Sequence, residues 1–265
     1  MPNFSLRAGF VYRGIRQNRQ RLNANQPFDA FNVPVAIADP GPDGIRGNAD
    51  DGKPVAGFNL DPALVSLQPY NVTRNVPDKY DYYNLEVTAN RRFTRGWSLL
   101  AAYAVRWNRD NGPGSTRANS NVLTPNDLIN TEEDRRYHYT YWSGKVQVTY
   151  DAPWGIRVSP VLRAQAGQQW GRTFVATMNY GSIRVLAEPL NTRRQDTILI
   201  VDTRVEKRFP LPLRPGVRLG VLVDFFNMFN ANPVESLQWS SGSSFLRPTA
   251  IVPPRIVRFG VKLDW

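Results

Sequence analysis

The chain has 265 residues, and its 33 Lys and Arg outnumber its 22 Asp and Glu to give a formal net charge of +11. The absence of cysteine excludes disulfides, cysteine-ligated zinc and thiol catalysis, and it suits an oxidising compartment such as a cell envelope. No apolar run approaches the roughly 18–20 residues of a transmembrane helix, and the first residues lack the basic segment and apolar core of a signal peptide.

Strict alternation of apolar and polar residues recurs along the chain and predicts β-strands with one apolar and one polar face. The pattern is clearest in residues 97–108, where the odd positions from Trp97 to Trp107 are apolar or aromatic. In chain order, the predicted strands cover residues 3–13, 80–93, 97–108, 137–150, 155–166, 197–209, 216–227 and 255–265. Each has the ~9–11 residues that a tilted membrane-spanning strand needs.

The connections between these strands alternate in length. The short ones cover residues 94–96, 151–155 and 210–216, and the long ones cover 14–79, 109–136, 167–196 and 228–254. Soluble domains rarely contain several structureless loops beyond ~12–15 residues, whereas outer-membrane barrels combine short periplasmic turns with long extracellular loops. The predicted fold class is therefore all-β: an antiparallel, up-and-down transmembrane β-barrel segment of about eight strands, ending in the periplasm at Trp265.

The two faces of the predicted strands suit lipid on one side and a polar lumen on the other. The polar positions carry Arg157, Arg163, Arg204, Arg208, Arg218 and Arg258, and we expect them to pair with Glu86, Asp202, Glu206 and Asp224. Aromatic residues gather near the strand ends, where interfacial girdles lie. A soluble antiparallel sandwich or barrel would also alternate. Pro160 cannot donate to a ladder, which predicts a bulge or a later strand start.

Residues 204–230, RVEKRFPLPLRPGVRLGVLVDFFNMFN, resemble the penultimate hairpin of TonB-dependent outer-membrane receptors. The matching Lys-x-Phe and Asp-x-Phe-Asn-x-x-Asn positions are Lys207, Phe209, Asp224, Phe226, Asn227 and Asn230. Residues 253–265, PPRIVRFGVKLDW, resemble the final strand of that family. Residues 82–103 and 187–209 resemble its Oar-like subgroup, which typically carries an N-terminal carboxypeptidase-regulatory-like domain.

A complete receptor of this family has a signal peptide, a TonB-contacting segment, a plug domain and a barrel of about 22 strands. Residues 1–265 therefore resemble the C-terminal third of such a barrel, without a plug domain. The resemblance implies uptake of an unidentified ligand across the outer membrane, energised by TonB through the N-terminal part of the receptor. The expected surroundings are outer-membrane lipid and lipopolysaccharide. The alternative is a free-standing small barrel with a structural or adhesion role, because eight strands can close by themselves.

We expect no enzymatic activity. His138, the only histidine, lies in the aromatic-rich stretch RRYHYTYW and is interpreted as a girdle or loop residue rather than a catalytic base. The sequence contains no G-x-S-x-G, H-E-x-x-H or Walker A motif. The charged cluster TEEDRR, residues 131–136, is interpreted as self-paired on a solvated loop, and the alternative interpretation is a pair of carboxylates for hydrolysis.

The net positive charge raises nucleic-acid binding as an alternative function. Its footprint would be a clustered basic face with aromatic residues for stacking. The arginines are instead spread over polar strand faces and loops, so we expect no nucleic-acid partner. The local basic group YRGIRQNRQR, residues 12–21, is interpreted as a cluster at headgroup level that faces lipopolysaccharide.

The segment DPGPDGIRGNADDG, residues 39–52, lies in the long connection 14–79 and is expected outside the cell. Calcium prefers about six to eight oxygen ligands. The residues that supply carboxylates or an amide here are Asp39, Asp43, Asn48, Asp50 and Asp51. Their spacing is not that of an EF-hand. Two interpretations stay open: a calcium site that orders the loop, and a solvated turn cluster without metal.

Overall fold

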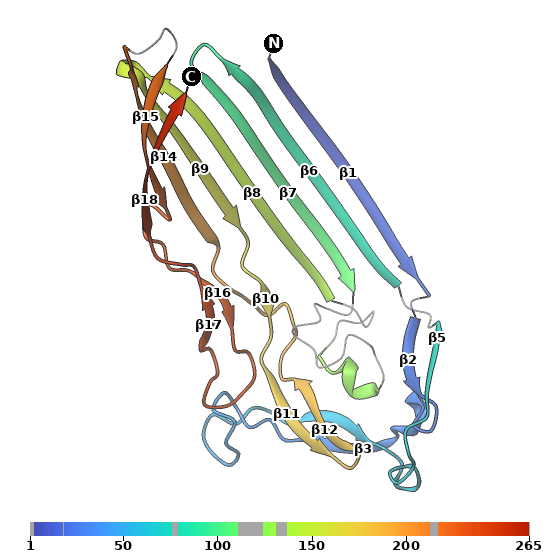
Figure 1. Cartoon of the computed structure of the whole chain (residues 1–265). Coiled ribbons are helices and arrows are strands. Elements are labelled where there is room, and N and C mark those ends of the chain that lie inside the picture. The colour runs from blue at the N-terminus through green and yellow to red at the C-terminus, as the bar shows by residue number, and fades with distance from the viewer. Residues whose placement is uncertain are drawn as a thin grey trace.

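The computed structural model describes residues 3–17, 19–75, 79–110, 124–130, 137–212 and 217–264. The chain is all-β, with 61% strand and 6% helix. Eight long strands form one antiparallel sheet in the order β1-β6-β7-β8-β9-β14-β15-β18 (Figure 1). They are β1 Phe4–Arg16, β6 Lys79–Thr94, β7 Trp97–Asp110, β8 Tyr137–Ala152, β9 Ile156–Gln165, β14 Ile198–Pro210, β15 Arg218–Phe226 and β18 Ile256–Asp264. Each overlaps a predicted strand, so the all-β, up-and-down prediction is confirmed.

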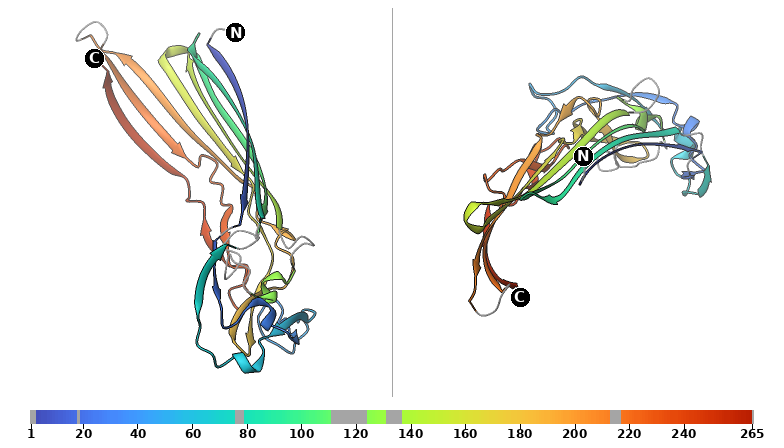
Figure 2. Two further views of the ribbon diagram at one scale, coloured as in Figure 1. Left: turned by 90° about the vertical axis from the view of Figure 1, so that its right-hand side faces the viewer. Right: turned by 90° about the horizontal axis from the view of Figure 1, so that it is seen from above.

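The sheet is open and curved. β1 and β18 form its two edges, and neither pairs with a further strand among those described. Seen from above, the strands follow an arc (Figure 2, right). The eight strands therefore form a curved open sheet here, and not an eight-stranded barrel closed on itself.

The short turns lie at one end of the sheet and the long connections at the other (Figure 1). Arg95 and Gly96 connect β6 to β7 with φ of 51° and 85°, and hairpin turns of type I′ require positive φ at both central positions. The turn between β8 and β9 is the 3-10 helix η4, Pro153–Gly155, in which Trp154 has φ 61°. The predicted alternation of short and long connections is thus confirmed.

The register places apolar residues on one face of all eight strands, here called the apolar face. From β1 to β18 its members include Leu6, Ala89, Ala101, Val146, Leu162, Val201, Val223 and Phe259. This face is uncovered: Phe259 is 77% exposed and Leu6 is 66% exposed. The opposite side of the sheet, here called the polar face, carries the charged residues of the alternating pattern.

Pro160 lies inside β9 rather than at its start. It pairs with Thr203 of β14 in an unbroken register. Toward β8, the pairing passes from Gln147 opposite Val161 to Tyr150 opposite Val158, and no ladder pair is recorded at the proline between them. The missing N–H of proline explains such a gap. The predicted bulge or later strand start is therefore wrong.

The described residues of the long connections fold into a second region, here called the loop layer. It contains five two-stranded sheets. Their strands are β2 Arg19–Asn23 with β5 Asn71–Asn75, β3 Val33–Ile37 with β4 Val55–Asn59, β10 Gln169–Trp170 with β13 Arg193–Arg194, β11 Thr173–Met178 with β12 Gly181–Leu186, and β16 Val234–Leu237 with β17 Pro248–Ile251. The 3-10 helices η1 Phe28–Ala30, η2 Pro62–Leu64 and η3 Pro125–Leu128 complete it. No helix in the described part of the chain is long and apolar enough to span a membrane.

The loop layer has a hydrophobic core of its own. One cluster contains Ile37, Phe174, Ala176, Met178 and Val185, and a second contains Ala30, Phe31 and Leu60. The first cluster joins Ile37 of the connection 14–79 to residues of the connection 167–196, and Tyr180 of that second connection packs against the second cluster. The long connections are therefore packed against one another instead of being separate solvated loops.

Asn126 joins three segments of the loop layer. Its side chain accepts a hydrogen bond from the Phe58 N–H at 2.8 Å and donates one to the Phe58 carbonyl at 2.8 Å. It also donates to the Tyr180 hydroxyl at 2.7 Å. Burial raises the pKa of Tyr180 above its ordinary value of 10.0, because the phenolate form is poorly solvated there.

Candidate ligand-binding site

Ion pairs cover the polar face from β9 to β18. Asp224, only 5% exposed, accepts hydrogen bonds from Arg204 (Nε to Oδ1, 2.6 Å) and Arg258 (Nη2 to Oδ2, 2.7 Å). Glu206 is likewise 5% exposed and pairs with Arg208 at 2.8 Å and Lys262 at 3.1 Å. The buried carboxylates thus have cationic partners, which offsets the cost of removing them from water.

Two further pairs extend this arrangement. Arg157 contacts Asp151 at 2.5 Å, and Arg163 contacts Asp202 at 2.7 Å. The predicted pairing with Asp202, Glu206 and Asp224 is confirmed for four of the arginines: Arg163, Arg204, Arg208 and Arg258. Arg157 pairs with Asp151 instead, and no ion pair of Arg218 with another described residue is recorded. Glu86 differs, because among its recorded bonds it accepts from the neutral Asn84 amide at 2.6 Å. A hollow of about 570 Å³ opens on this face beside Arg163, Arg204 and Asp224.

The asparagines of the Asp-x-Phe-Asn-x-x-Asn stretch shape the chain after β15. Asn227 and Asn230 have φ of 49° and 55°, a left-handed conformation that asparagine tolerates. The Asn227 amide donates to the carbonyls of Ala231 (2.7 Å) and Pro253 (2.9 Å), and the Asn230 side chain accepts from the Arg255 N–H at 2.9 Å. The motif therefore holds the start of β18 beside the end of β15.

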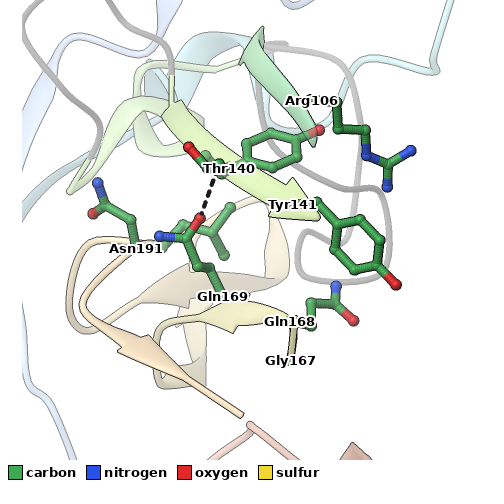
Figure 3. Close-up of a pocket in the computed structure, with 9 residues that line it drawn as sticks. Arg106, Thr140, Tyr141, Gly167, Gln168, Gln169 and Asn191 are labelled. Carbon is green, nitrogen blue, oxygen red and sulfur yellow. Dashed lines mark hydrogen bonds between the residues drawn. The ribbon is translucent and has the colours of Figure 1, made fainter. Parts of the chain in front are cut away.

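A pocket of about 270 Å³ lies where the polar face meets the loop layer (Figure 3). β9 ends at Gln165, opposite Ser143 of β8, and the chain then turns away from the sheet. Gly167 permits this departure, because a Cβ there would stand 2.0 Å from the Gln195 carbonyl oxygen. The end of β8 nearest the loop layer is left without β9 beside it, and the pocket forms at that place.

Beyond the end of β9, side chains form the hydrogen bonds to β8 that a neighbouring strand would otherwise form. Gln169 Oε1 accepts a hydrogen bond from the Thr140 N–H at 3.2 Å (Figure 3), and Arg194 donates to the Thr140 carbonyl at 3.1 Å. Arg194 also donates to the Gly167 carbonyl at 3.1 Å. Unpaired backbone groups are costly away from water, so these bonds keep the end of β8 extended and fix the pocket wall.

The pocket is lined by aromatic, amide and cationic side chains. Arg106 of β7 and Tyr141 of β8 are direct register partners, and the guanidinium lies 4.7 Å from the centre of the Tyr141 ring. Tyr139 packs against the buried pair Leu186 and Leu190. The remaining side chains at the pocket include those of Gln168, Gln169 and Asn191. No aspartate or glutamate is among the lining residues.

The segment 39–52 is tied into the loop layer through Asp39. This residue is 5% exposed, and its carboxylate pairs with Arg172 at 2.5 and 2.7 Å. Arg172 also donates to the Gly41 carbonyl at 3.0 Å and to the Ser241 hydroxyl at 2.8 Å. Asp39, a predicted calcium ligand, thus forms a buried ion pair in the structure, and Arg172 neutralises its charge.

The other predicted calcium ligands accept hydrogen bonds from the loop itself. Asp43 accepts from the Ile45 N–H and the Asn48 amide, both at 2.8 Å, and Asp51 accepts from the Gly47 N–H at 2.7 Å. Asp50 accepts from the Asp43 N–H at 3.3 Å. The described residues contain no group of three or more His, Cys, Asp or Glu arranged to hold a metal ion. Calcium binding by this loop stays a prediction.

Three other predicted features can be placed. His138 accepts a hydrogen bond from Arg109 Nε at 2.7 Å on the exposed surface of the sheet. In the basic stretch 12–21, Arg16 pairs with Asp81 at 2.6 Å where β1 meets the loop layer. The cluster at 131–136 and the terminal Trp265 lie outside the described residues.

No protein-family model, curated protein or solved structure matches this chain. The likeness to TonB-dependent receptors therefore rests on the sequence motifs alone. Sequence reasoning did not single out the pocket residues Gln168, Gln169 and Asn191, because they lie in a long connection without periodicity. The available signal is the amide pair in GQQW, residues 167–170, directly after a predicted strand.

Proposed function

We propose that the chain is a segment of an outer-membrane β-barrel of the TonB-dependent receptor type, with its polar face along a path for ligand uptake. The observation that carries this proposal is the location of the buried apolar residues. Of the buried hydrophobic residues described, only Ile198 belongs to the eight-stranded sheet, and the others belong to the connections between its strands. The sheet therefore gains almost no core from its apolar face.

An uncovered apolar face of this extent is unfavourable in water. Burying one large apolar side chain is worth ~1.5–3 kcal/mol, and soluble monomers rarely expose apolar patches above a few hundred Å². Membrane lipid would cover Leu6, Val146 and Phe259 together, while the ion-paired polar face would line a lumen. A soluble sandwich would need a second sheet on the apolar face, and none of the described sheets lies against it.

The two edges of the sheet give a further reason to place it within a larger barrel. No other described strand pairs with the outer edges of β1 and β18, and in hydrocarbon each unpaired backbone group costs several kcal/mol. Additional strands that pair with both edges would satisfy these groups. This requirement agrees with the resemblance to a barrel of about 22 strands.

A structural or adhesion role is the second candidate, and the loop layer is the observation that favours it. Its packed core and five small sheets would present a fixed surface outside the cell. In that role, loss of the polar-face charges would leave function unchanged. In the uptake role, it would reduce ligand passage.

The membrane assignment is tested with two neighbouring substitutions in the full chain. Val146→Arg places a charge on the apolar face of β8, and Gln147→Arg places the same charge on the polar face. For a membrane-spanning sheet, Val146→Arg lowers the free energy of unfolding in lipid bilayers by about 2–4 kcal/mol, and Gln147→Arg changes it little. Equal effects of the two substitutions on bilayer insertion and on urea unfolding would contradict the proposal.

A further inference from the structure

We propose that the pocket bounded by Arg106, Tyr139, Tyr141, Gln168, Gln169 and Asn191 is a subsite for an acidic sugar unit, a single pyranose ring that carries a carboxylate. This inference rests on the proposed uptake function and gives it a ligand class. The subsite lies at the loop-layer end of the polar face, where a ligand arriving from outside would first meet the sheet.

The charge of the pocket favours an anion. Arg106 makes no ion pair with any of the residues that the structure describes; its recorded contact is the Tyr141 ring. Arg163, Arg204 and Arg258 on the same face all have carboxylate partners. Because a guanidinium offers a planar fork of donors, an arginine without an acid partner suits a carboxylate that binds through both oxygens.

Because Arg106 is the only cation that lines the pocket, a carboxylate fits better than a phosphate. One guanidinium balances the single charge of a carboxylate. A phosphate monoester carries nearly two charges and is usually held by several cations or by a group of backbone N–H donors. The residues that line the pocket provide one guanidinium and no carboxylate.

The two tyrosines suit a ring with both apolar and polar parts. Tyr139 and Tyr141 are two residues apart on β8, so both side chains belong to the polar face. Tyrosine combines a flat apolar ring with a hydroxyl that donates and accepts. A pyranose has patches of C–H groups that can lie on such a ring and hydroxyls that can reach its oxygen. Arg106 and Leu190 hold the two rings in place.

The amide of Gln169 completes the match with a hydroxyl-rich ligand. Each amide side chain offers both a carbonyl acceptor and an NH₂ donor, as a sugar hydroxyl does. The bond from Thr140 to Gln169 Oε1 fixes that amide and leaves its Nε2 without an acceptor among the described residues. The volume of about 270 Å³ is close to the lower end of ligand pockets and suits one ring rather than a chain.

The test uses the full chain in lipid bilayers and titrates galacturonate, galactose and acetate separately by calorimetry. Galactose has the ring without the charge, and acetate has the charge without the ring. We expect galacturonate to bind at least ~10-fold more tightly than either, because a charge-assisted bond and the ring contacts act together. Arg106→Gln should reduce galacturonate binding about 10-fold and reduce galactose binding much less, because only galacturonate loses the charge-assisted bond.

Two controls separate this inference from the proposed function. Arg7→Gln removes a positive charge from β1, at a position that lies opposite Thr88 of β6 and away from the pocket. This variant should leave galacturonate binding unchanged. Failure of galacturonate to bind a chain that shows the Val146/Gln147 contrast would overturn the subsite alone, as would equal binding by wild type and Arg106→Gln. If Val146→Arg and Gln147→Arg have equal effects but galacturonate still binds in an Arg106-dependent way, the membrane assignment is overturned and the subsite is supported.

Discussion

The eight-stranded sheet and the loop layer use their apolar residues in opposite ways. In the loop layer, Phe174 and Leu60 are 0% exposed, whereas Phe259 and Val261 of the sheet are 77% and 70% exposed. Both regions belong to one chain and are built from β-strands, so secondary structure does not explain the difference. The difference agrees with the proposed function, in which the loop layer faces water and the apolar face of the sheet meets lipid.

Their ion pairs differ in the same way. The Arg172–Asp39 pair of the loop layer has side chains only 10% and 4% exposed, whereas Arg258, which pairs with Asp224 on the polar face, is 60% exposed. A pair removed from water is costly to break and little affected by salt, while an exposed partner is screened. The loop-layer pair therefore behaves as part of a core, whereas the Arg258–Asp224 pair of the polar face keeps its arginine in solvent.

The largest expected effect is on the loop-layer core. Phe174→Ala removes a fully buried ring and should lower the stability of the loop layer by about 3–5 kcal/mol. Protease resistance of the loop layer measures this, and insertion of the sheet into lipid bilayers should persist. Val175→Ala, at a position 54% exposed, is the control and should have little effect. If the loop layer and the sheet both unfold in Phe174→Ala, the two regions do not have separate stabilities.

The buried ion pair gives the next effect. Arg172→Met leaves the Asp39 carboxylate buried without its partner, which should cost the loop layer about 3 kcal/mol or slightly more. The double variant Asp39→Asn with Arg172→Met removes both charges and should recover much of this loss. Urea titration followed by protease cleavage compares the three proteins. The account is contradicted if the double variant is less stable than Arg172→Met alone.

A smaller effect is expected on the polar face. Asp224→Asn leaves Arg204 and Arg258 close together without the carboxylate, and we expect a loss of roughly 1 kcal/mol, since both arginines are largely exposed and screened. The loss should shrink when salt is raised from low to molar concentration. The stability of Arg172→Met relative to wild type, by contrast, should change little with salt. A salt-independent loss in Asp224→Asn would remove this distinction between the two regions.

The smallest effect concerns pH. Because burial raises the pKa of Tyr180 in the folded chain, its contribution is fully present below the ordinary value of 10.0 and is lost as pH rises through the higher folded value. The loop layer of the wild type should therefore lose stability above about pH 10 more steeply than that of Tyr180→Phe. Protease resistance at increasing pH measures the difference. Parallel pH profiles of the two proteins would show that Tyr180 is not the residue responsible.

Local patterns were sufficient to predict the sheet. Alternation located all eight strands, and the residues between β6 and β7 carried a short turn signal in Gly96. These features depend on neighbours in the sequence. The ion pairs of Asp202, Glu206 and Asp224 also followed, because polar residues on one face of an antiparallel sheet lie beside one another.

The loop layer and the pocket depend on contacts that no local pattern contains. Asp39 meets Arg172 across 133 residues, so the composition of residues 39–52, which left a calcium site and a turn cluster open, could not reveal that its first carboxylate pairs with arginine. The pocket likewise combines Arg106 with Gln169 and Asn191, and depends on β9 ending at Gln165. Only the packed arrangement of the connections brings these residues together.

The central claim is that the apolar face of the sheet meets lipid. Because the chain has no cysteine, single cysteines can be placed in turn at residues 145–149 and labelled with a fluorophore in bilayers. Labels at 146 and 148 should be quenched by lipid-borne quenchers, and labels at 145, 147 and 149 by aqueous iodide, with a period of two residues. Uniform quenching by iodide at all five positions would contradict the account.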